Sequence, residues 1–272
     1  VGARAVVQGQ PFAEGRCLAV VGSRNPTAQG ADNAYQFAKA LGATGLTIVS
    51  GLALGVDAAA HEGALAPIAP DRSLKEGDAP TTIAVVGTGL DRVYPSRHLD
   101  LAHRIARHGL LVSEYPLGTP PLAPNFPKRN RIISGLSQGT LVVEAALASG
   151  SLITARLATE QGREVFAIPG SIHAPQSRGC HALIKQGAKL VESAQDVLEE
   201  CRWALPAATS FTAGDTAVGT DEPAATVPQE SALLQAMGYD PVGLDALVNR
   251  TGMDAASLQV QLLELELDGV VA

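Results

Sequence analysis

The chain has 272 residues, of which 46% are hydrophobic and 17% charged, and this composition excludes a disordered or fibrous protein. No apolar run approaches the roughly 20 residues that a membrane-spanning helix needs, so we expect a soluble protein without a membrane partner. The three cysteines, Cys17, Cys180 and Cys201, have neither an even count nor a paired spacing, and they support neither a disulfide framework nor a metal site. A reducing, cytoplasmic location is therefore predicted.

The net charge of −7 is unevenly distributed along the chain. Residues 1–203 hold 19 Lys and Arg against 17 Asp and Glu, a balance of +2, whereas residues 204–272 hold 1 against 10, a balance of −9. Within residues 92–131, seven basic residues face two acidic ones. An anionic partner is therefore compatible with the first part of the chain despite the net acidity of the whole.

Seven short apolar runs rich in β-branched residues predict seven strands. They occupy residues 17–21, 46–50, 82–86, 110–114, 140–144, 164–168 and 188–191. Unbroken apolar runs are typical of parallel strands that are covered on both faces, and the segments between these runs are long enough for crossover helices. We therefore predict an α/β domain over residues 1–203, with an extended Rossmann-like, doubly wound and mostly parallel sheet.

The remainder of the chain predicts a linker and a small second domain. Residues 204–228 are mainly Ala, Thr, Pro and Gly without periodicity, which indicates a flexible linker. Residues 229–272 contain three amphipathic segments with short turns, which indicates a winged-helix-like α domain. The polar residues of its third segment include no Lys or Arg: Gln259, Gln261, Glu264, Glu266 and Asp268. Because phosphates would repel these carboxylates, we expect this helix to contact a protein or a second copy rather than DNA.

Gly22, Ser23 and Arg24 follow the first predicted strand and precede a predicted helix at 28–41. A glycine lets the backbone approach a ligand, a helix N-terminus offers free N–H groups, and an arginine adds a bidentate phosphate contact. The segment therefore suggests a phosphate-binding loop. A tight turn with an exposed arginine is the alternative, and the sequence leaves both open.

Two further predicted strands end in glycines, at 51–55 and 87–89, but neither segment has the third glycine of a dinucleotide-binding fingerprint. We therefore expect no nicotinamide cofactor. Asp57 and His61 share a face of the next predicted helix, and no third ligand or nucleophile accompanies them. We interpret Asp57 as a first-turn carboxylate that the helix dipole favours, and His61 as a packed or hydrogen-bonded side chain.

A basic segment at 125–137 is the most informative stretch of the chain. Pro127 suits a first helical position, which puts three cations in or near the opening turn: Lys128, Arg129 and Arg131. Positive charge there opposes the helix dipole, so a bound phosphate would compensate it. Ion pairs to Glu114 or Glu144 are the alternative, but they would leave at least one of the three cations unpaired.

Three aromatic residues in or near this basic region each precede a proline: Tyr94, Tyr115 and Phe126. A ring held in a loop beside Arg or Lys can stack a nucleic-acid base, which is worth about 1–3 kcal/mol per base and tolerates any sequence. Core packing is the alternative, and it stays open for the two tyrosines in particular.

Glu144 follows the fifth predicted strand and is the one candidate for a catalytic acid or base. Small residues at 149–151, ahead of a predicted helix at 151–162, again suit phosphate. No nucleophile with a paired base accompanies them, so we expect a binding protein rather than an enzyme. The alternative comes from a second resemblance: the GT-x-x-x-E strand end at 139–144, near an arginine, is similar to that of the nucleoside monophosphate phosphoribohydrolases of the lysine-decarboxylase-like fold.

These motifs occur in one order along the chain. They are VGSR (21–24), SGLALGVDAAAH (50–61), TIAVVGTGLDRVYP (82–95), SEYPLGTPP (113–121), NFPKRNRIISGLS (125–137), VVEAALASGSLITARLATEQGREVFAIPG (142–170) and LIKQGA (183–188). In this order they resemble the DprA/Smf family, the DNA-processing proteins of natural transformation. The resemblance implies a homodimer without a cofactor, which binds single-stranded DNA in any sequence, protects incoming strands and loads the RecA recombinase.

The resemblance also implies a set of DNA-binding residues. They are Gly22, Ser23, Arg24, Phe126, Lys128, Arg129, Asn130 and Arg131. The chain departs from the family pattern at Cys180 and His181, where the family has Thr-Asn after the glycine. The family often carries a helical domain ahead of the Rossmann domain, so we expect residues to precede Val1. We place the expected dimer interface toward residues 170–200, because an open sheet needs its edge strand covered.

Overall fold

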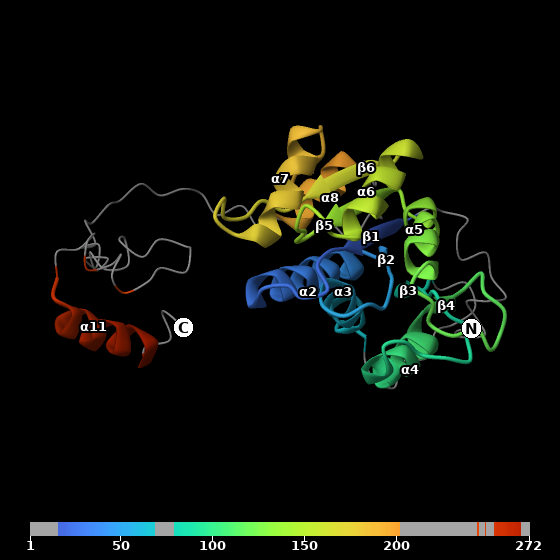
Figure 1. Cartoon of the computed structure of the whole chain (residues 1–272), viewed down its shortest axis with the longest axis horizontal. Helices are drawn as coiled ribbons and strands as arrows, with labels where there is room; N and C mark the ends of the chain where they lie inside the picture. Colours follow the sequence, from blue (N-terminus) through green and yellow to red (C-terminus); the bar gives the residue numbers. More distant parts are fainter. Residues whose placement is uncertain (1–15, 69–78, 202–243, 245–247, 249–252, 268–272) are drawn as a thin grey trace, which may run out of the picture. The chain divides into compact units, whose positions relative to one another are not determined.

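Figure 1 shows a computed structural model of the chain. It describes residues 16–68, 79–201, 244, 248 and 253–267. The chain divides into two compact units, Val1–Thr209 and Ser210–Ala272. The predicted linker at 204–228 lies outside the described residues. No helix in the described ranges is both long and apolar enough to cross a membrane.

The larger unit contains a seven-stranded parallel sheet, as predicted, in the order β4-β3-β2-β1-β5-β6-β7. The strands are β1 Cys17–Val21, β2 Thr47–Ser50, β3 Thr82–Val85, β4 Leu110–Val112, β5 Gly139–Val142, β6 Glu164–Ala167 and β7 Lys189–Leu190. Strand β1 pairs with β2 on one side and with β5 on the other, so the strand order reverses there. In open α/β sheets, ligands bind outside the carboxyl ends of the strands at such a reversal.

Helices cover both faces of the sheet, which confirms the doubly wound prediction (Figure 1). They are α2 Ala28–Ala43, α3 Val56–Leu65, α4 Leu99–His108, α5 Asn125–Leu136, α6 Ser151–Glu160, α7 Arg178–Lys185 and α8 Ala194–Glu200, with short 3-10 helices η1 Ser96–His98 and η2 Pro175–Ser177. Alternate residues of β1 point to opposite faces. Leu18 and Val20 pack against α2, α3 and α8, whereas Ala19 and Val21 join the cluster that includes α5, α6 and α7.

The prediction for the start of α5 is wrong by two residues. The helix begins at Asn125, so Pro127 is its third residue rather than its first. Lys128 therefore follows the first three helical residues, and Arg129 and Arg131 lie still further along α5. The dipole effect falls off within the first turn, so it is weak at Arg129 and Arg131. The predicted need for a phosphate to offset the helix dipole therefore does not apply to these two arginines.

In the smaller unit, helix α11 spans Ala255–Leu267 and agrees with the third amphipathic segment. Leu258 is fully buried, and Leu244, Met253, Leu262 and Leu265 pack around it. The side chains of Glu264 and Glu266 are exposed, as the sequence predicts.

Candidate nucleic-acid interface

A cavity of about 570 Å³ lies at the reversal in strand order, beyond the carboxyl ends of β1 and β5. Its walls come from the β1–α2 loop, the β2–α3 loop with the first turn of α3, helix α5, the loop before α6 and the start of α6. They are lined by Val21, Gly22, Ser23, Arg24, Asn25, Ala53, Asp57, Phe126, Pro127, Arg129, Asn130, Ile133, Ala146, Ala148, Ser149, Gly150, Ser151, Ile153 and Thr154. The sheet thus brings together segments that are more than 100 residues apart in the chain.

The cavity unites six of the eight residues expected to bind DNA. They are Gly22, Ser23, Arg24, Phe126, Arg129 and Asn130. The other two are exposed on α5 and do not line the cavity. Arg131 forms an ion pair with Glu114, which is one of the two pairings that the sequence left open. Among the described residues neither Lys128 nor Arg129 makes an ion pair, so two of the three cations of the basic segment are not paired with a carboxylate, and Arg129 donates to backbone carbonyls instead.

Gly22 is required at the end of β1 because the chain is crowded there. A Cβ atom at this position would lie 2.7 Å from Cγ2 of Val56 and 2.9 Å from the carbonyl oxygen of Glu144. The backbone N–H of Val56 also donates to the carbonyl oxygen of Ser23 at 3.1 Å. The β1–α2 loop is thereby pressed against the start of α3, and Arg24 extends from it as an exposed side chain.

The N-terminus of α2 is not an open anion site, because the Glu144 carboxylate already occupies it. Oε2 of Glu144 accepts from the Thr27 backbone N–H at 2.9 Å, and Oε1 accepts from the Thr27 hydroxyl at 2.5 Å. The Thr27 hydroxyl oxygen in turn accepts from the backbone N–H of Gly30 at 3.0 Å. Gly22, Ser23 and Arg24 therefore reach the cavity from the loop before the helix, and the helix end itself is capped by the protein.

Arg129 lines the cavity but is only 4% exposed, so it is a structural cation as well as a wall residue. Its Nη1 donates to the carbonyl oxygen of Gly51 at 2.6 Å and to that of Val85, which ties together the carboxyl ends of β2 and β3. One sequence signal indicates this burial: Asn125, Arg129 and Ile133 are spaced four apart, share one face of α5 and are all buried.

Asp57 lies beside Arg129 and fixes the loop after β2. It is 7% exposed, and its Oδ2 accepts from the backbone N–H groups of Gly51 at 3.1 Å and Ala53 at 3.3 Å. Burial raises the pKa of the Asp57 carboxyl, and the Arg129 charge and these hydrogen bonds oppose the rise. Burial likewise lowers the pKa of Arg129, and Asp57 opposes the fall.

His61 and Asp57 behave as the sequence indicates. Asp57 lies in the first turn of α3, and the His61 ring is fully buried with Nδ1 2.7 Å from the Thr82 hydroxyl oxygen. The Thr82 hydroxyl donates to the carbonyl oxygen of Ile48, so it accepts from a protonated Nδ1 of His61. Across the described parts of the chain, no group of three or more His, Cys, Asp or Glu side chains is arranged to hold a metal.

The Phe126 ring links two other loops at the cavity. The guanidinium carbon of Arg24 lies 5.9 Å from its centroid, within cation–π range, and the Tyr94 ring lies 5.4 Å from it. Tyr115 is different, because it does not line the cavity and its hydroxyl donates to the carbonyl oxygen of Asn125 at 3.3 Å. Packing is therefore the role of Tyr115, whereas Phe126 presents its ring to the cavity.

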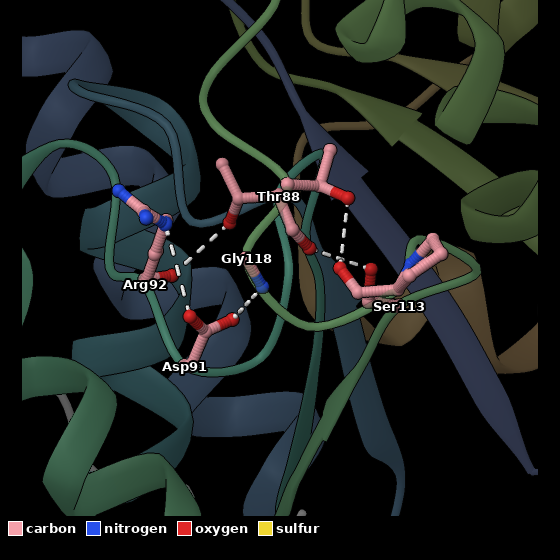
Figure 2. A network of polar contacts seen from close by, with 7 residues as sticks. Thr88, Asp91, Arg92, Ser113 and Gly118 are labelled. Atoms are coloured by element: carbon pink, nitrogen blue, oxygen red, sulfur yellow. Dashed lines mark hydrogen bonds and ion pairs between the residues drawn. The ribbon is translucent and has the colours of Figure 1, made fainter.

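A polar network holds the loop after β3 against the loop after β4 (Figure 2). The Ser113 hydroxyl donates to the Thr88 carbonyl oxygen at 2.7 Å, and the Thr88 hydroxyl donates to that of Arg92 at 3.0 Å. Oδ1 of Asp91 accepts from the Gly118 N–H at 2.8 Å, and this hydrogen bond lowers the pKa of Asp91. The network fixes the segment that leads to Tyr94.

Sequence reasoning left several wall residues out of the expected site. Ser149 and Gly150 border the cavity just before α6, and Ser151 and Thr154 border it from the helix itself. The backbone N–H of Ser151 donates to the Ser149 hydroxyl oxygen at 3.3 Å. The small residues at 149–151 did indicate a phosphate-compatible helix start. Asn25 and Ala53 carry no comparable signal, because only the folded chain brings their loops to the cavity.

Comparison with protein families matches residues 6–202 to the family described as DNA recombination-mediator protein A, and residues 219–272 to the DprA winged helix domain. Protein Smf of Escherichia coli K12 is 46% identical over 261 residues, which cover 94% of this chain and 65% of that protein. DNA processing protein DprA of Bacillus subtilis is 46% identical over 189 residues, which cover 70% of this chain and 60% of that protein. The chain thus spans less than two thirds of the length of these relatives.

Two solved structures resemble the larger part of the chain. DNA processing protein A from Streptococcus pneumoniae superposes with a TM-score of 0.61 and 49% identity, over 70% of this chain and 62% of that one. The Helicobacter pylori protein, whose structure is described as giving insights into a unique single-stranded DNA binding mode, superposes with a TM-score of 0.62 and 30% identity. That match covers 74% of this chain and 84% of the other.

Proposed function

The chain belongs to the DNA recombination-mediator protein A family, and from this premise we propose that its cavity binds single-stranded DNA of any sequence. One observation carries the proposal: the fold gathers Arg24, Phe126 and the start of α6 around one cavity, although they come from distant segments. The single-stranded DNA binding described for the Helicobacter pylori protein supports the same ligand here.

The chemistry of the cavity suits a strand without sequence preference. Arg24 is exposed and can contact a phosphate, while the half-buried ring of Phe126 can stack a base. Ser149, Ser151 and Thr154, at the start of α6, add hydroxyl groups to the lining of the cavity. Phosphates and ring faces are common to all nucleotides, so these contacts carry no base specificity.

We further propose that the protein works as a homodimer in the cytoplasm, protects incoming single strands and passes them to the RecA recombinase, without catalysis or a cofactor. An interface within residues 170–200 is supported by two exposed apolar side chains in this range, Ile172 and Leu190, the second of which belongs to the edge strand β7. The domain boundaries 1–203, 204–228 and 229–272 stay predictions, with the last segment as the winged-helix domain.

The phosphoribohydrolase alternative receives less support, because its acid–base residue is engaged elsewhere. Glu144 caps α2 through Thr27 and is not among the residues that line the cavity. Release of free base from nucleoside monophosphates, abolished in Glu144→Gln, is the result that would restore this alternative.

The proposal is tested by fluorescence anisotropy with a labelled oligo-dT of ~30 nucleotides, a length that exceeds the ~4–16 nucleotides of common single-strand sites, and with a matching duplex. We expect the wild type to prefer the single strand. In Arg24→Ala/Lys128→Ala the log–log salt slope should fall by about 0.7 for each phosphate contact that is lost. Arg163→Ala is the control. This exposed cation directly precedes β6, so it lies at the amino ends of the parallel strands, whereas the cavity lies beyond their carboxyl ends. Equal affinity for duplex, or a double variant that binds like the wild type, would overturn the proposal.

A further inference from the structure

A second aromatic ring continues the cavity wall beyond Phe126. Tyr94 lies between β3 and η1, and its ring centroid is 5.4 Å from that of Phe126, with an angle of 37° between the planes. Phe126 lines the cavity whereas Tyr94 does not, and Tyr94 is 49% exposed. The tyrosine ring therefore stands at the outer side of the wall that Phe126 forms, open to solvent.

The segment that carries Tyr94 is held in place before any ligand arrives. The network of Figure 2 ties Thr88 and Asp91 to the loop after β4, and the Gly89 N–H donates to the carbonyl oxygen of Thr119 at 3.0 Å. On the other side, Nδ1 of His98 lies 3.0 Å from the carbonyl oxygen of Leu52. A ring that is already fixed loses little conformational entropy when it stacks on a ligand.

Positive charge accompanies this ring. Between residues 91 and 107, four arginines outnumber two aspartates. Arg97 is exposed three residues after Tyr94, and within the described chain no ion pair engages it. Of the two aspartates, Asp91 is already occupied by the Gly118 N–H and by Arg92 at 3.7 Å, while Asp100 is exposed in the first turn of α4.

We propose that the DNA strand leaves the cavity over Phe126, that the next base stacks on Tyr94, and that Arg97 contacts the phosphate beside it. This proposal rests on the proposed function. The ring separation of 5.4 Å exceeds the ~3.4 Å rise per nucleotide of a duplex strand, so two neighbouring unstacked bases suit the two rings better than a stacked helix does. The ring and the exposed cation at one wall favour a nucleic acid here over a docked protein.

The test compares Tyr94→Ala, Tyr94→Phe and Arg97→Gln with the wild type in oligo-dT binding, each after its thermal unfolding has been checked. Tyr94→Ala should weaken binding about 5- to 150-fold with an unchanged salt slope, because stacking carries no charge. Tyr94→Phe, which keeps the ring, should bind like the wild type. Arg97→Gln should reduce the salt slope by about 0.7.

Tyr35→Ala is the matched control, because Tyr35 is also partly exposed beside a cation, Lys39, whose Nζ lies 6.0 Å from its ring centroid. A second readout is direct: the fluorescence of 2-aminopurine placed within the oligo-dT should be quenched by the wild type and recover in Tyr94→Ala at one position.

The outcomes separate the two proposals. Suppose that the wild type binds oligo-dT and that Arg24→Ala weakens this binding, while Tyr94→Ala binds like Tyr35→Ala. The proposed path of the strand over Tyr94 is then wrong, and the cavity proposal stands. The same holds if 2-aminopurine fluorescence is identical in the two variants at every position, and Tyr94 is then left to a protein contact. If the wild type does not bind oligo-dT, both proposals fall.

Discussion

Two arginines of α5 have different roles. Arg129 and Arg131 are two positions apart on α5, yet Arg129 is sealed against backbone carbonyls and Arg131 pairs with Glu114 at the surface. A buried guanidinium must find acceptors for its donors, since an unsatisfied charge in the interior costs several kcal/mol. The carbonyl oxygens of Gly51 and Val85 accept from Nη1, whereas the buried Nε has no hydrogen-bond partner among the described residues. Arg129 therefore shapes the cavity from within its wall.

A pH dependence of stability follows from His61. Burial, together with the nearby charges of Arg129 and His98, lowers the pKa of His61 to about 3 from 6.5. Between these values the unfolded chain binds more protons than the folded one, so stability falls as the pH falls, by at most about 1.4 kcal/mol per pH unit. His61→Asn keeps a polar atom near Thr82 but does not titrate, so its free energy of unfolding should depend less steeply on pH.

Urea unfolding between pH 7 and pH 4.5 measures this difference, with His103→Asn as the control because His103 is exposed. The raised pKa of Asp57 acts in the opposite direction, since its folded state favours the protonated form and stability is lost as the pH rises. The comparison of variants cancels that contribution. An identical pH slope in His61→Asn and the wild type would contradict the assignment.

At the scale of elements, the crossing of α2 and α3 depends on one glycine. A Cβ atom at Gly63 would overlap the backbone carbonyl oxygen of Tyr35, whereas a Cβ atom at Gly135 in α5 would meet nothing closer than 3.9 Å. Gly63→Ala should therefore lower the free energy of unfolding by about 1–3 kcal/mol through overpacking. Gly135→Ala should raise it by about 0.5–1 kcal/mol, because alanine favours the helix.

Chemical denaturation of the two variants measures both effects, and their opposite signs are the informative result. Both substitutions add one methyl group to a helix, so helix propensity alone would stabilise both. A stabilised Gly63→Ala would mean that α2 and α3 separate easily enough to admit the added methyl group, and it would contradict the overpacking argument.

The whole molecule combines a nearly neutral larger part with an acidic tail. Residues 1–203 have a balance of +2 and residues 204–272 one of −9, so the tail should repel DNA at long range. A chain ending at residue 203 should bind oligo-dT with a rate constant about 3- to 10-fold higher at low salt, and with almost no difference at ~0.15 M, where charges are screened beyond about 8 Å.

Stopped-flow fluorescence across ionic strength measures these rate constants, after circular dichroism has established that the shortened chain folds. A shortened chain that does not fold would contradict the predicted boundary at 203. Equal rate constants for a folded shortened chain at low salt would show that the acidity of the tail is directed away from the DNA.

The pattern of apolar residues alone was enough to place the strands of the sheet. Unbroken apolar runs located all seven strands, because a parallel strand covered on both faces has no polar side to display. Six of the eight expected DNA-binding residues also meet at one cavity, since the carboxyl ends of neighbouring parallel strands share one edge of the sheet.

The role of each polar side chain, by contrast, depends on the folded chain. Glu144 caps a helix 117 residues away at Thr27, and Arg129 binds carbonyls 78 and 44 residues away. Local sequence shows that a carboxylate or a guanidinium is present, but its partner depends on which strand ends the sheet places beside it. The two roles differ because burial makes an unpaired charge costly, and burial is a property of the folded chain.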